Sequence, residues 1–337
     1  MKKLSFLILG LLIIPTFFLT SCDRGDDPSD GVVATPKFTL MKDYVVDNNL
    51  DIDNILTNSL NEKFVAGPPA TSADVDAFLS SYYIMDIRSS ADFTATGHVA
   101  GANNVAFANI LTEAPKAGTK PILVVCYTGQ TACYATALLR LYGYPRTQAL
   151  KWGMSGWNSN NATSWNNAIT GNIANGHSNW SFTAAPAKVV YKDPTITSLS
   201  SDGLAILKSR VEEVVAAGFT PATVKGSDVL ANPSGYFINN YFSETDYLGF
   251  GHIAGANRIL PLNLGDDTYL GLDNNAKVVV YCYTGQTSAV VAACLRVFGY
   301  DAYSLTFGMN GLYNNNPAWT SNKWSSSVPK NYPVVYN

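Results

Sequence analysis

The feature that most constrains this chain is an internal repeat that spans most of its 337 residues. The hexapeptide Cys-Tyr-Thr-Gly-Gln-Thr occurs twice, at 126–131 and 282–287, each time after a run of apolar residues. Gly-His-x-Ala-Gly-Ala-Asn also occurs twice, at 97–103 and 251–257, so the copies lie 154 to 156 residues apart. A period this long is that of a whole domain rather than of a solenoid repeat. The length and the 47% hydrophobic content allow two domains, each with its own core.

We therefore expect two homologous domains, over residues 38–157 and 194–337, joined by a linker over 158–193. The linker is rich in Asn, Ser and Gly, which favour irregular backbone. We nevertheless expect it to pack against the domains because it also carries large aromatic side chains: Trp165, Trp180 and Phe182.

Within each copy, short β-rich runs alternate with helical patterns, which is typical of a parallel sheet covered on both faces. In the first copy we expect strands at 83–87, 104–107, 122–126 and near 147–150. The expected helices are at 72–80, at 131–142 and, in the second copy, at 203–217. The predicted fold class is α/β, with two domains that each have a central parallel sheet flanked by helices.

The N-terminus has the pattern of an export signal: two lysines, an apolar stretch of about 16 residues, then Leu-Thr-Ser-Cys at 19–22. The apolar stretch is shorter than the roughly 20 residues that span a bilayer. Leu-Thr-Ser-Cys resembles the lipobox of bacterial lipoproteins, in which the cysteine is acylated and becomes the first residue of the mature chain. We predict a signal peptide over 1–22, a tether over 23–37 and lipidation of Cys22, with an uncleaved anchor or an ordinary secretory signal as alternatives. The body would then be held in the cell envelope by acyl chains, facing the periplasm or the surface.

Composition excludes several other functions. The net charge is −3 and no basic run is present, which argues against a nucleic-acid site. No His, Cys and carboxylate cluster has metal-ligand spacing, so we predict neither a metal nor a cofactor. Cys133 and Cys294 lie in apolar, helix-like stretches at positions that do not correspond between the copies, so we expect buried free thiols rather than a disulfide.

Each hexapeptide places a cysteine between a buried strand and a helix that we expect to begin near Thr131 or Thr287 and to be capped by that threonine. Backbone N–H groups of such a turn can point at the sulfur, and the helix N-terminus adds a positive field. Gly129 and Gly285 permit the positive φ that this geometry requires. The turn would stabilise a thiolate or a persulfide without a charged side chain, which predicts a nucleophile. A purely structural cysteine is disfavoured because the hexapeptides stayed identical while the rest of the repeat diverged.

Around these motifs the first copy reads Asp-Ile-Arg at 86–88, Asp-Phe at 92–93 and Gly-Met at 153–154. Together the motifs resemble the rhodanese family of sulfurtransferases, over nearly all of the chain after about residue 40. The resemblance implies that a cysteine thiolate takes a sulfane sulfur from a donor and passes it, through a persulfide, to cyanide or a thiol. The implied catalytic residues are Cys126 and Cys282, and the implied substrate-binding loops consist of Tyr127, Thr128, Gly129, Gln130, Thr131, Tyr283, Thr284, Gly285, Gln286 and Thr287.

Supporting roles also follow from the resemblance. We expect Asp86 and Arg88 to form an ion pair that braces the first loop. The second copy has Asn-Tyr-Phe at 240–242 instead, so its loop must be braced differently. In the family the histidine at the positions of His98 and His252 largely holds the following loop, and we expect these two to be architectural rather than acid–base groups.

Two departures from the family bear on the substrate. Asp92 and Asp246 stand where typical two-domain members carry a substrate-binding arginine, and neither loop has a basic residue. Thiosulfate is therefore expected to be a poor donor, with a neutral or protein-borne persulfide as the alternative. Typical tandem members have lost the cysteine of the first domain, whereas this chain keeps both, so we expect both to load sulfur. The expected partners are a small-molecule donor, a thiol or cyanide acceptor and a redox protein.

Two other functions remain as alternatives. The first is a non-catalytic rhodanese-like module that presents a persulfide or docks a redox partner. The second is a phosphatase or arsenate reductase of the same fold, which grips an oxyanion with a Cys-x5-Arg loop. Ala132 and Ser288 occupy the arginine position here, which disfavours the second alternative.

Overall fold

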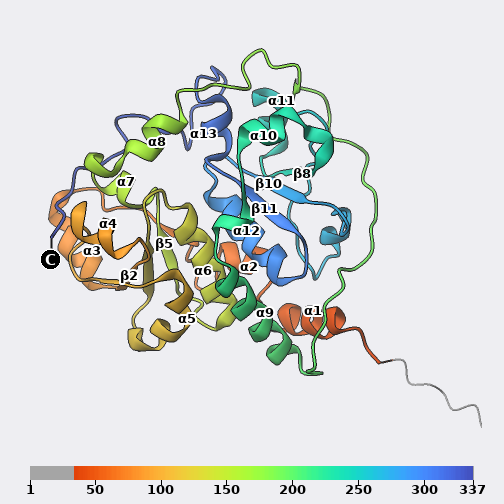
Figure 1. Ribbon diagram of the computed structural model, residues 1–337, viewed down its shortest axis with the longest axis horizontal. Helices are drawn as coiled ribbons and strands as arrows, with labels where there is room; N and C mark the ends of the chain where they lie inside the picture. The colour runs from red at the N-terminus through yellow and green to blue at the C-terminus, as the bar shows by residue number, and fades with distance from the viewer. Residues whose placement is uncertain (1–33, 337) are drawn as a thin grey trace, which may run out of the picture. The chain divides into compact units, whose positions relative to one another are not determined.

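The computed structural model describes residues 34–336, and the part from Thr35 onward forms one compact unit (Figure 1). The predicted signal peptide, the predicted lipidation at Cys22 and most of the predicted tether lie outside the described residues. Within the described range, no helix is both long enough and apolar enough to cross a membrane.

The first half contains a five-stranded, fully parallel sheet in the order β1-β5-β4-β2-β3. Its strands are β1 (Val65–Ala66), β2 (Tyr83–Asp86), β3 (Ala102–Asn104), β4 (Ile122–Val125) and β5 (Gln148–Leu150). Helices α3 (Val75–Ser80) and α7 (Gly153–Trp157) pack on one face. Helices α5 (Ile110–Glu113) and α6 (Gln130–Tyr142) pack on the other, and α4 (Ser90–Ala95) connects β2 to β3.

The second half repeats this plan with a four-stranded parallel sheet in the order β7-β11-β10-β8. Its strands are β7 (Thr223–Val224), β8 (Phe237–Asn240), β10 (Val278–Tyr281) and β11 (Ala302–Leu305). One face is covered by α10 (Gly226–Ala231), α11 (Glu244–Phe250) and α13 (Gly308–Tyr313), and the other by α12 (Gln286–Val297). The α/β fold class with a covered parallel sheet in each half is confirmed.

The central strands are apolar because both of their faces are buried. In β4, Leu123 and Val125 pack with the outer helices, whereas Val124 and the following Cys126 pack with α6. This alternation follows from the two-residue period of a strand. It directs the cysteine that ends the strand toward the centre of the molecule.

Helices α6 and α12 pack against each other between the two sheets, and α9 (Gly203–Ala217) contacts both (Figure 1). Their apolar side chains form the largest core cluster, in which Cys133 and Cys294 are fully buried. All four cysteines of the described residues are free thiols, as expected for these two. Burial raises the pKa of both Cys133 and Cys294, so both stay protonated and unreactive.

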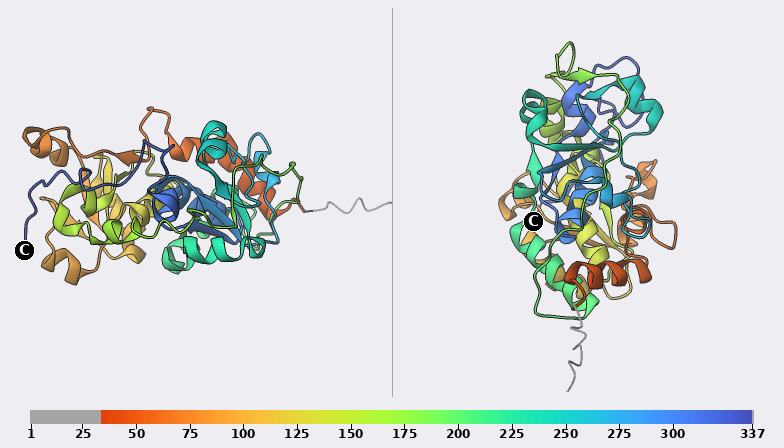
Figure 2. Two further views of the ribbon diagram at one scale, coloured as in Figure 1. Left: turned by 90° about the horizontal axis from the view of Figure 1, so that it is seen from above. Right: turned by 90° about the vertical axis from the view of Figure 1, so that its right-hand side faces the viewer.

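The ends of the described chain cross between the halves. Helix α1 (Lys37–Asp47) packs against α9, and after α2 (Ile52–Leu56) the chain enters the first sheet. The Asp51 carboxylate accepts hydrogen bonds from two backbone N–H groups of the second half, at 2.9 and 2.8 Å. At the other end, the N–H of Tyr332 donates to the Trp157 carbonyl at 3.0 Å, and the C-terminal segment lies along the first half (Figure 2). A cut within the predicted linker would separate each terminal segment from the half on which it packs.

Most expected elements agree with the observed ones to within one residue. The exception in the first sheet is the strand expected at 104–107, because β3 ends at Asn104. The Asn104 side-chain amide donates to the carbonyls of Asp86 and Arg88, at 3.2 and 2.9 Å, and a 3-10 helix begins at Phe107. The helix expected at 72–80 begins as a 3-10 turn that continues into α3.

The predicted linker contains α8 (Thr163–Ala168) and β6 (Trp180–Ser181), which pairs antiparallel with β9 (His252–Ile253). Trp165 is fully buried, and Trp180 is half-buried with its Nε1–H donating to the Phe250 carbonyl at 3.3 Å. The packing expectation is wrong for Phe182, which is 59% exposed because it follows a two-residue edge strand. From there the chain follows the outer edge of the second half to α9 (Figure 1).

Candidate active site

The first hexapeptide turns tightly around the sulfur of Cys126. Its Sγ accepts hydrogen bonds from the backbone N–H groups of Gly129 at 3.2 Å and Ala132 at 3.3 Å. Cys126 directly follows β4, and the 13-residue helix α6 begins at Gln130. The sulfur therefore lies at a helix N-terminus, where the helix dipole and the two donors favour a negative charge.

The second hexapeptide surrounds Cys282 in a similar way but adds a hydroxyl pair. Its Sγ accepts from the Ser288 N–H at 3.3 Å, and the thiol donates to Ser288 Oγ at 3.7 Å. The Ser288 hydroxyl is 2.8 Å from that of Ser304, and both side chains are fully buried. Ala132 and Ala149 hold the corresponding positions of the first half, which therefore lacks these hydroxyls.

The turn depends on a glycine before each helix. Gly129 and Gly285 are the N-cap residues, with φ of 83° and 75°, so the expected positive φ is confirmed. The expectation that Thr131 and Thr287 cap the helices is wrong, because both lie inside the first turn. The hydroxyl of the threonine that precedes each glycine instead accepts from the first helical N–H, at 3.5 Å for Thr128 and 3.2 Å for Thr284.

Both sulfurs are buried, with Cys126 4% and Cys282 1% exposed. Burial raises the pKa of the Cys126 thiol, and the N–H groups of its own loop lower it by less. The nearby Asp86 carboxylate also raises the pKa of Cys126. The loop thus offsets part of the cost of ionising a buried thiol, but not all of it.

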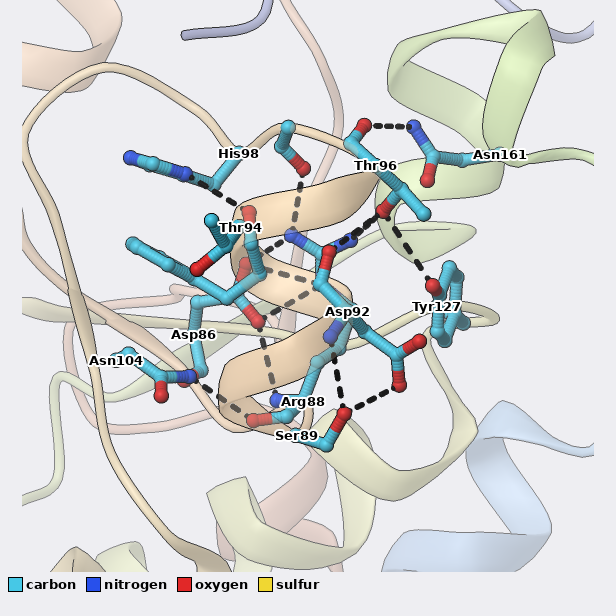
Figure 3. Close-up of polar contacts among 12 residues, drawn as sticks. Asp86, Arg88, Ser89, Asp92, Thr94, Thr96, His98, Asn104, Tyr127 and Asn161 are labelled. Carbon is cyan, nitrogen blue, oxygen red and sulfur yellow. Dashed lines mark hydrogen bonds and ion pairs between the residues drawn. The ribbon is translucent and has the colours of Figure 1, made fainter. Parts of the chain in front are cut away.

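Asp86 and Arg88 form a buried ion pair behind the first loop, as expected (Figure 3). The Arg88 guanidinium donates to both carboxylate oxygens and also to the Thr96 hydroxyl and the Gly97 carbonyl, each at 2.9 Å. It lies 5.0 Å from the ring centre of Tyr127, the residue after the first cysteine. The pair therefore ties the end of β2 and the segment after α4 to the loop.

The second loop is braced by aromatic stacking rather than by an ion pair, which confirms that the two differ. Asn240 replaces the aspartate, and its Oδ1 accepts from the Phe242 N–H at 2.8 Å. The Phe242 ring replaces the guanidinium and stacks on Tyr283, with ring centres 4.5 Å apart. The Tyr283 hydroxyl donates in turn to Asp246.

The two histidines are buried beside their loops and bonded to backbone. Their Nδ1 atoms lie 3.2 Å from the Phe93 carbonyl for His98 and 3.0 Å from the Tyr247 carbonyl for His252. Each ring also stacks on the aromatic ring of that same residue, with ring centres 3.5 and 3.6 Å apart. Because a carbonyl can only accept, Nδ1 carries the proton, and the contacts suit an architectural role.

Asp92 and Asp246 lie in the first turns of α4 and α11. In both helices the aspartate N–H donates to the hydroxyl of the preceding N-cap serine, at 3.1 Å. These two aspartates therefore lie in the first turn of a helix, at the positions where typical two-domain members of the family carry a substrate-binding arginine.

The two loops touch each other, a contact that no sequence motif indicates. The side-chain oxygen of Gln130 accepts from the Phe307 N–H at 2.8 Å, and that of Gln286 accepts from the Trp152 N–H at 3.1 Å. Both aromatic residues have left-handed backbone, with φ of 61° and 65°. A Cβ on Gly285 would lie 2.3 Å from the Gln130 oxygen, so the loop glycine also makes room for the opposite glutamine. The contacts are reciprocal, and each loop holds the other half of the molecule.

The Trp-Gly-Met-Ser segment at 152–155 supports the base of the first loop, a role that the repeat pattern did not reveal. The Met154 N–H donates to the carbonyl of Cys126 at 2.8 Å, and Ser155 donates twice to that of Tyr127, at 2.9 and 2.8 Å. A Cβ on Gly153 would lie 2.3 Å from the Cys126 carbonyl oxygen. The corresponding segment of the second half makes the same contacts through Met309 and Asn310.

The fold and the site define a protein of two parallel α/β domains, each with a cysteine in a turn at the carboxyl end of its central strand. Both domains are rhodanese-like: the family model described as Rhodanese-like domain matches residues 71–160 and 242–315. The chain is thus a tandem rhodanese-like protein, as its motifs indicated. Across residues 34–336, no group of three or more His, Cys, Asp or Glu side chains could hold a metal ion.

Several solved structures are similar in fold. One is a thiosulfate sulfurtransferase from Pseudomonas aeruginosa, 13% identical, with 87% of this chain and 50% of that chain covered and a TM-score of 0.25. A 3-mercaptopyruvate sulfurtransferase from Leishmania major is 13% identical over 75% of this chain and 76% of its own, with a TM-score of 0.27. The chain spans half the length of the Pseudomonas protein, and no curated protein sequence matches it.

Proposed function

We propose that the protein is a sulfurtransferase in which Cys126 and Cys282 each carry sulfur as a persulfide. The observation that carries this proposal is that backbone N–H groups at the start of a helix donate to each sulfur, two of them to Cys126 and one to Cys282. Such donors stabilise the two anions that the reaction needs, the attacking thiolate and the terminal sulfur of the persulfide. The identical hexapeptide around both cysteines supports the same role for each.

The reaction would proceed in two balanced steps. The cysteine thiolate attacks the sulfane sulfur of a donor such as thiosulfate, a new S–S bond forms, and the S–S bond of the donor breaks with its electron pair leaving on sulfite. The acceptor then attacks the outer sulfur: cyanide leaves as thiocyanate, or a thiolate as a persulfide, and the cysteine thiolate is regenerated. No external oxidant or reductant is consumed.

The test is turnover to thiocyanate by the protein with cyanide as acceptor. Thiosulfate and a glutathione persulfide would be compared as donors, in Cys126→Ser, in Cys282→Ser and in the double variant. We expect each single variant to keep part of the rate and the double variant to lose it. Cys133→Ala is the matched control, because that thiol is buried in α6 and stays protonated.

We further propose that the body is held at the cell envelope through acylation of Cys22. Support for this comes from the sequence pattern at residues 1–22 alone. Metabolic labelling with a radioactive fatty acid, compared with a Cys22→Ser variant, tests it directly. Loss of label only in the variant is the expected result, and label in both or in neither contradicts the proposal.

The burial of both sulfurs favours one alternative, a non-catalytic module that uses the same fold to dock a redox partner. The alternative predicts that neither cysteine in the folded protein gains sulfur from any donor, whereas the unfolded protein is fully alkylated. The transferase predicts loading of the folded protein.

A further inference from the structure

A pocket of about 230 Å³ lies against the second loop and contains residues from both halves. From the second half it is lined by four of the five residues that follow Cys282: Tyr283, Thr284, Gln286 and Thr287. Phe64, Val65 and the two lysines Lys63 and Lys151 line it from the first half, and Asn322 completes it. The basic side chains that the loop itself lacks are therefore supplied by the opposite half of the chain.

The two lysines give the pocket a positive charge that nothing within it neutralises. None of its nine lining residues carries a carboxylate. Lys151 is half-buried, and its Nζ donates to Asn322 Oδ1 at 3.3 Å. Burial lowers the pKa of Lys151 and the positive charge of Lys63 lowers it further, because the two ammonium groups line the same pocket and repel each other. An anion between them would relieve this repulsion.

The loop contributes groups that suit an anion as well. The pocket includes two hydroxyl donors, Thr284 and Thr287, at the start of the 12-residue helix α12. Hydroxyls, lysines and a helix N-terminus together form a favourable setting for a small oxyanion.

The two positions that correspond to these lysines carry no charge beside the first loop, where the nearby Arg88 is paired with Asp86. Aligning the sheets by strand pairing equates β1 with β7, so Lys63 corresponds to Pro221. Lys151, which precedes Trp152, corresponds to Thr306, which precedes Phe307. Thr306 lies next to the first loop, since the adjacent Phe307 N–H is bonded to Gln130. The two sites thus have the same loop sequence, but the half of the chain that faces the second loop contributes two lysines, whereas the half that faces the first loop contributes Pro221 and Thr306 at the corresponding positions.

We infer that Lys63 and Lys151 bind an anionic sulfur donor beside Cys282, whereas the first loop has no anion-binding site of this kind. The inference rests on the proposed function for its biological meaning, because it gives two loops of identical sequence different affinities for an anionic donor. The anion site itself needs no chemistry at the cysteine and can be tested without it.

The binding test uses isothermal titration of the full chain carrying Cys126→Ser and Cys282→Ser with thiosulfate, so that no sulfur can be transferred. We expect one site per chain, and adding Lys63→Gln and Lys151→Gln should weaken binding at least about tenfold, as for loss of bonds to charged groups. Lys120→Gln is the matched control, because Lys120 lines a different pocket. Lys63→Gln alone, at an exposed side chain, covers the case in which the double lysine variant does not fold.

Binding that is absent, that the lysine changes leave unaltered, or that occurs at two equal sites would overturn the inference. A parallel measurement of sulfur loading separates it from the proposed function. Lysine-dependent binding without loading of either cysteine leaves the anion site standing and removes the transferase. If thiosulfate loads Cys282 equally well in the double lysine variant, the transferase stands and the anion site is removed.

Discussion

The side-chain oxygen of Gln130 accepts a hydrogen bond from the Phe307 N–H at 2.8 Å, so a residue of the first loop holds the segment that supports the second. Gln286 returns the contact to Trp152 at 3.1 Å. This reciprocity gives a physical reason for the identical hexapeptides, since each glutamine must fit beside the glycine of the other loop. The two candidate sites are consequently linked by direct hydrogen bonds from their own loops.

A Gln130→Leu substitution tests whether this contact makes one site depend on the other. It removes the acceptor for the Phe307 N–H and should lower the free energy of unfolding by about 1–3 kcal/mol. It should also speed alkylation of Cys282, because a looser supporting segment exposes this buried thiol, although the changed residue belongs to the other loop. Urea unfolding and alkylation by iodoacetamide in a Cys126→Ser background measure the two effects. An unaltered alkylation rate at Cys282 would show that the loops act independently.

The buried Asp86–Arg88 pair should matter more for stability than any surface pair. Arg88→Met leaves the Asp86 carboxylate buried without its partner and should cost about 3–5 kcal/mol of unfolding free energy. The second half does without the pair, so Asp86→Asn combined with Arg88→Phe should recover much of that loss. Urea unfolding of the single and double variants measures both free energies. A double variant that is no more stable than Arg88→Met would contradict this explanation.

Ser288 should accelerate the reaction of Cys282, because its hydroxyl can turn to donate to the thiolate once the thiol has lost its proton. Loss of one hydrogen bond to a charged group corresponds to about a tenfold effect. Ser288→Ala should therefore slow alkylation of Cys282 by about that factor and leave Cys126 unchanged. Competitive labelling followed by peptide mass analysis reports both thiols in one sample, and equal slowing at both would point to general unfolding instead.

The reactivity of Cys126 should depend on pH in a defined direction. Burial raises the pKa of its thiol, so the thiolate is scarce until the pH exceeds the value of about 8.5 for a free cysteine. Alkylation of Cys126 in a Cys282→Ser background should still be rising at a pH where a free thiol has reached its plateau. If the alkylation rate of Cys126 stops rising at the same pH as that of glutathione, or at a lower pH, the prediction is contradicted.

Burial also lowers the pKa of His252, so the folded state binds a proton at this site less readily than the unfolded state. The resulting stability is present above the ordinary histidine pKa of about 6.5 and is lost as the pH falls through the lowered value. His252→Asn, which keeps an amide donor for the Tyr247 carbonyl, should flatten this acid-side loss. Unfolding free energies measured at several pH values from neutral to mildly acidic check it, and an unchanged slope in the variant assigns the loss to other groups.

The sequence predicted what local pattern determines. Buried strands and the turn glycines follow from period and φ preference, and the Asp86–Arg88 pair was expected from the resemblance to the rhodanese family. Contacts that depend on how the two halves dock could not be predicted. They are the hydrogen bonds of Gln130 and Gln286 to the opposite half, the two lysines beside the second loop, and the packing of each chain end on the other half. The predicted threonine cap failed because each helix is preceded by a left-handed glycine, Gly129 or Gly285, which places Thr131 and Thr287 inside the first turn.

The most direct test of the central claim is the intact mass of the reduced, folded protein after incubation with thiosulfate or glutathione persulfide, before and after cyanide. The account predicts the gain of one sulfur atom at each of Cys126 and Cys282, mapped by peptide analysis and removed by cyanide. No gain at either cysteine with either donor would contradict it.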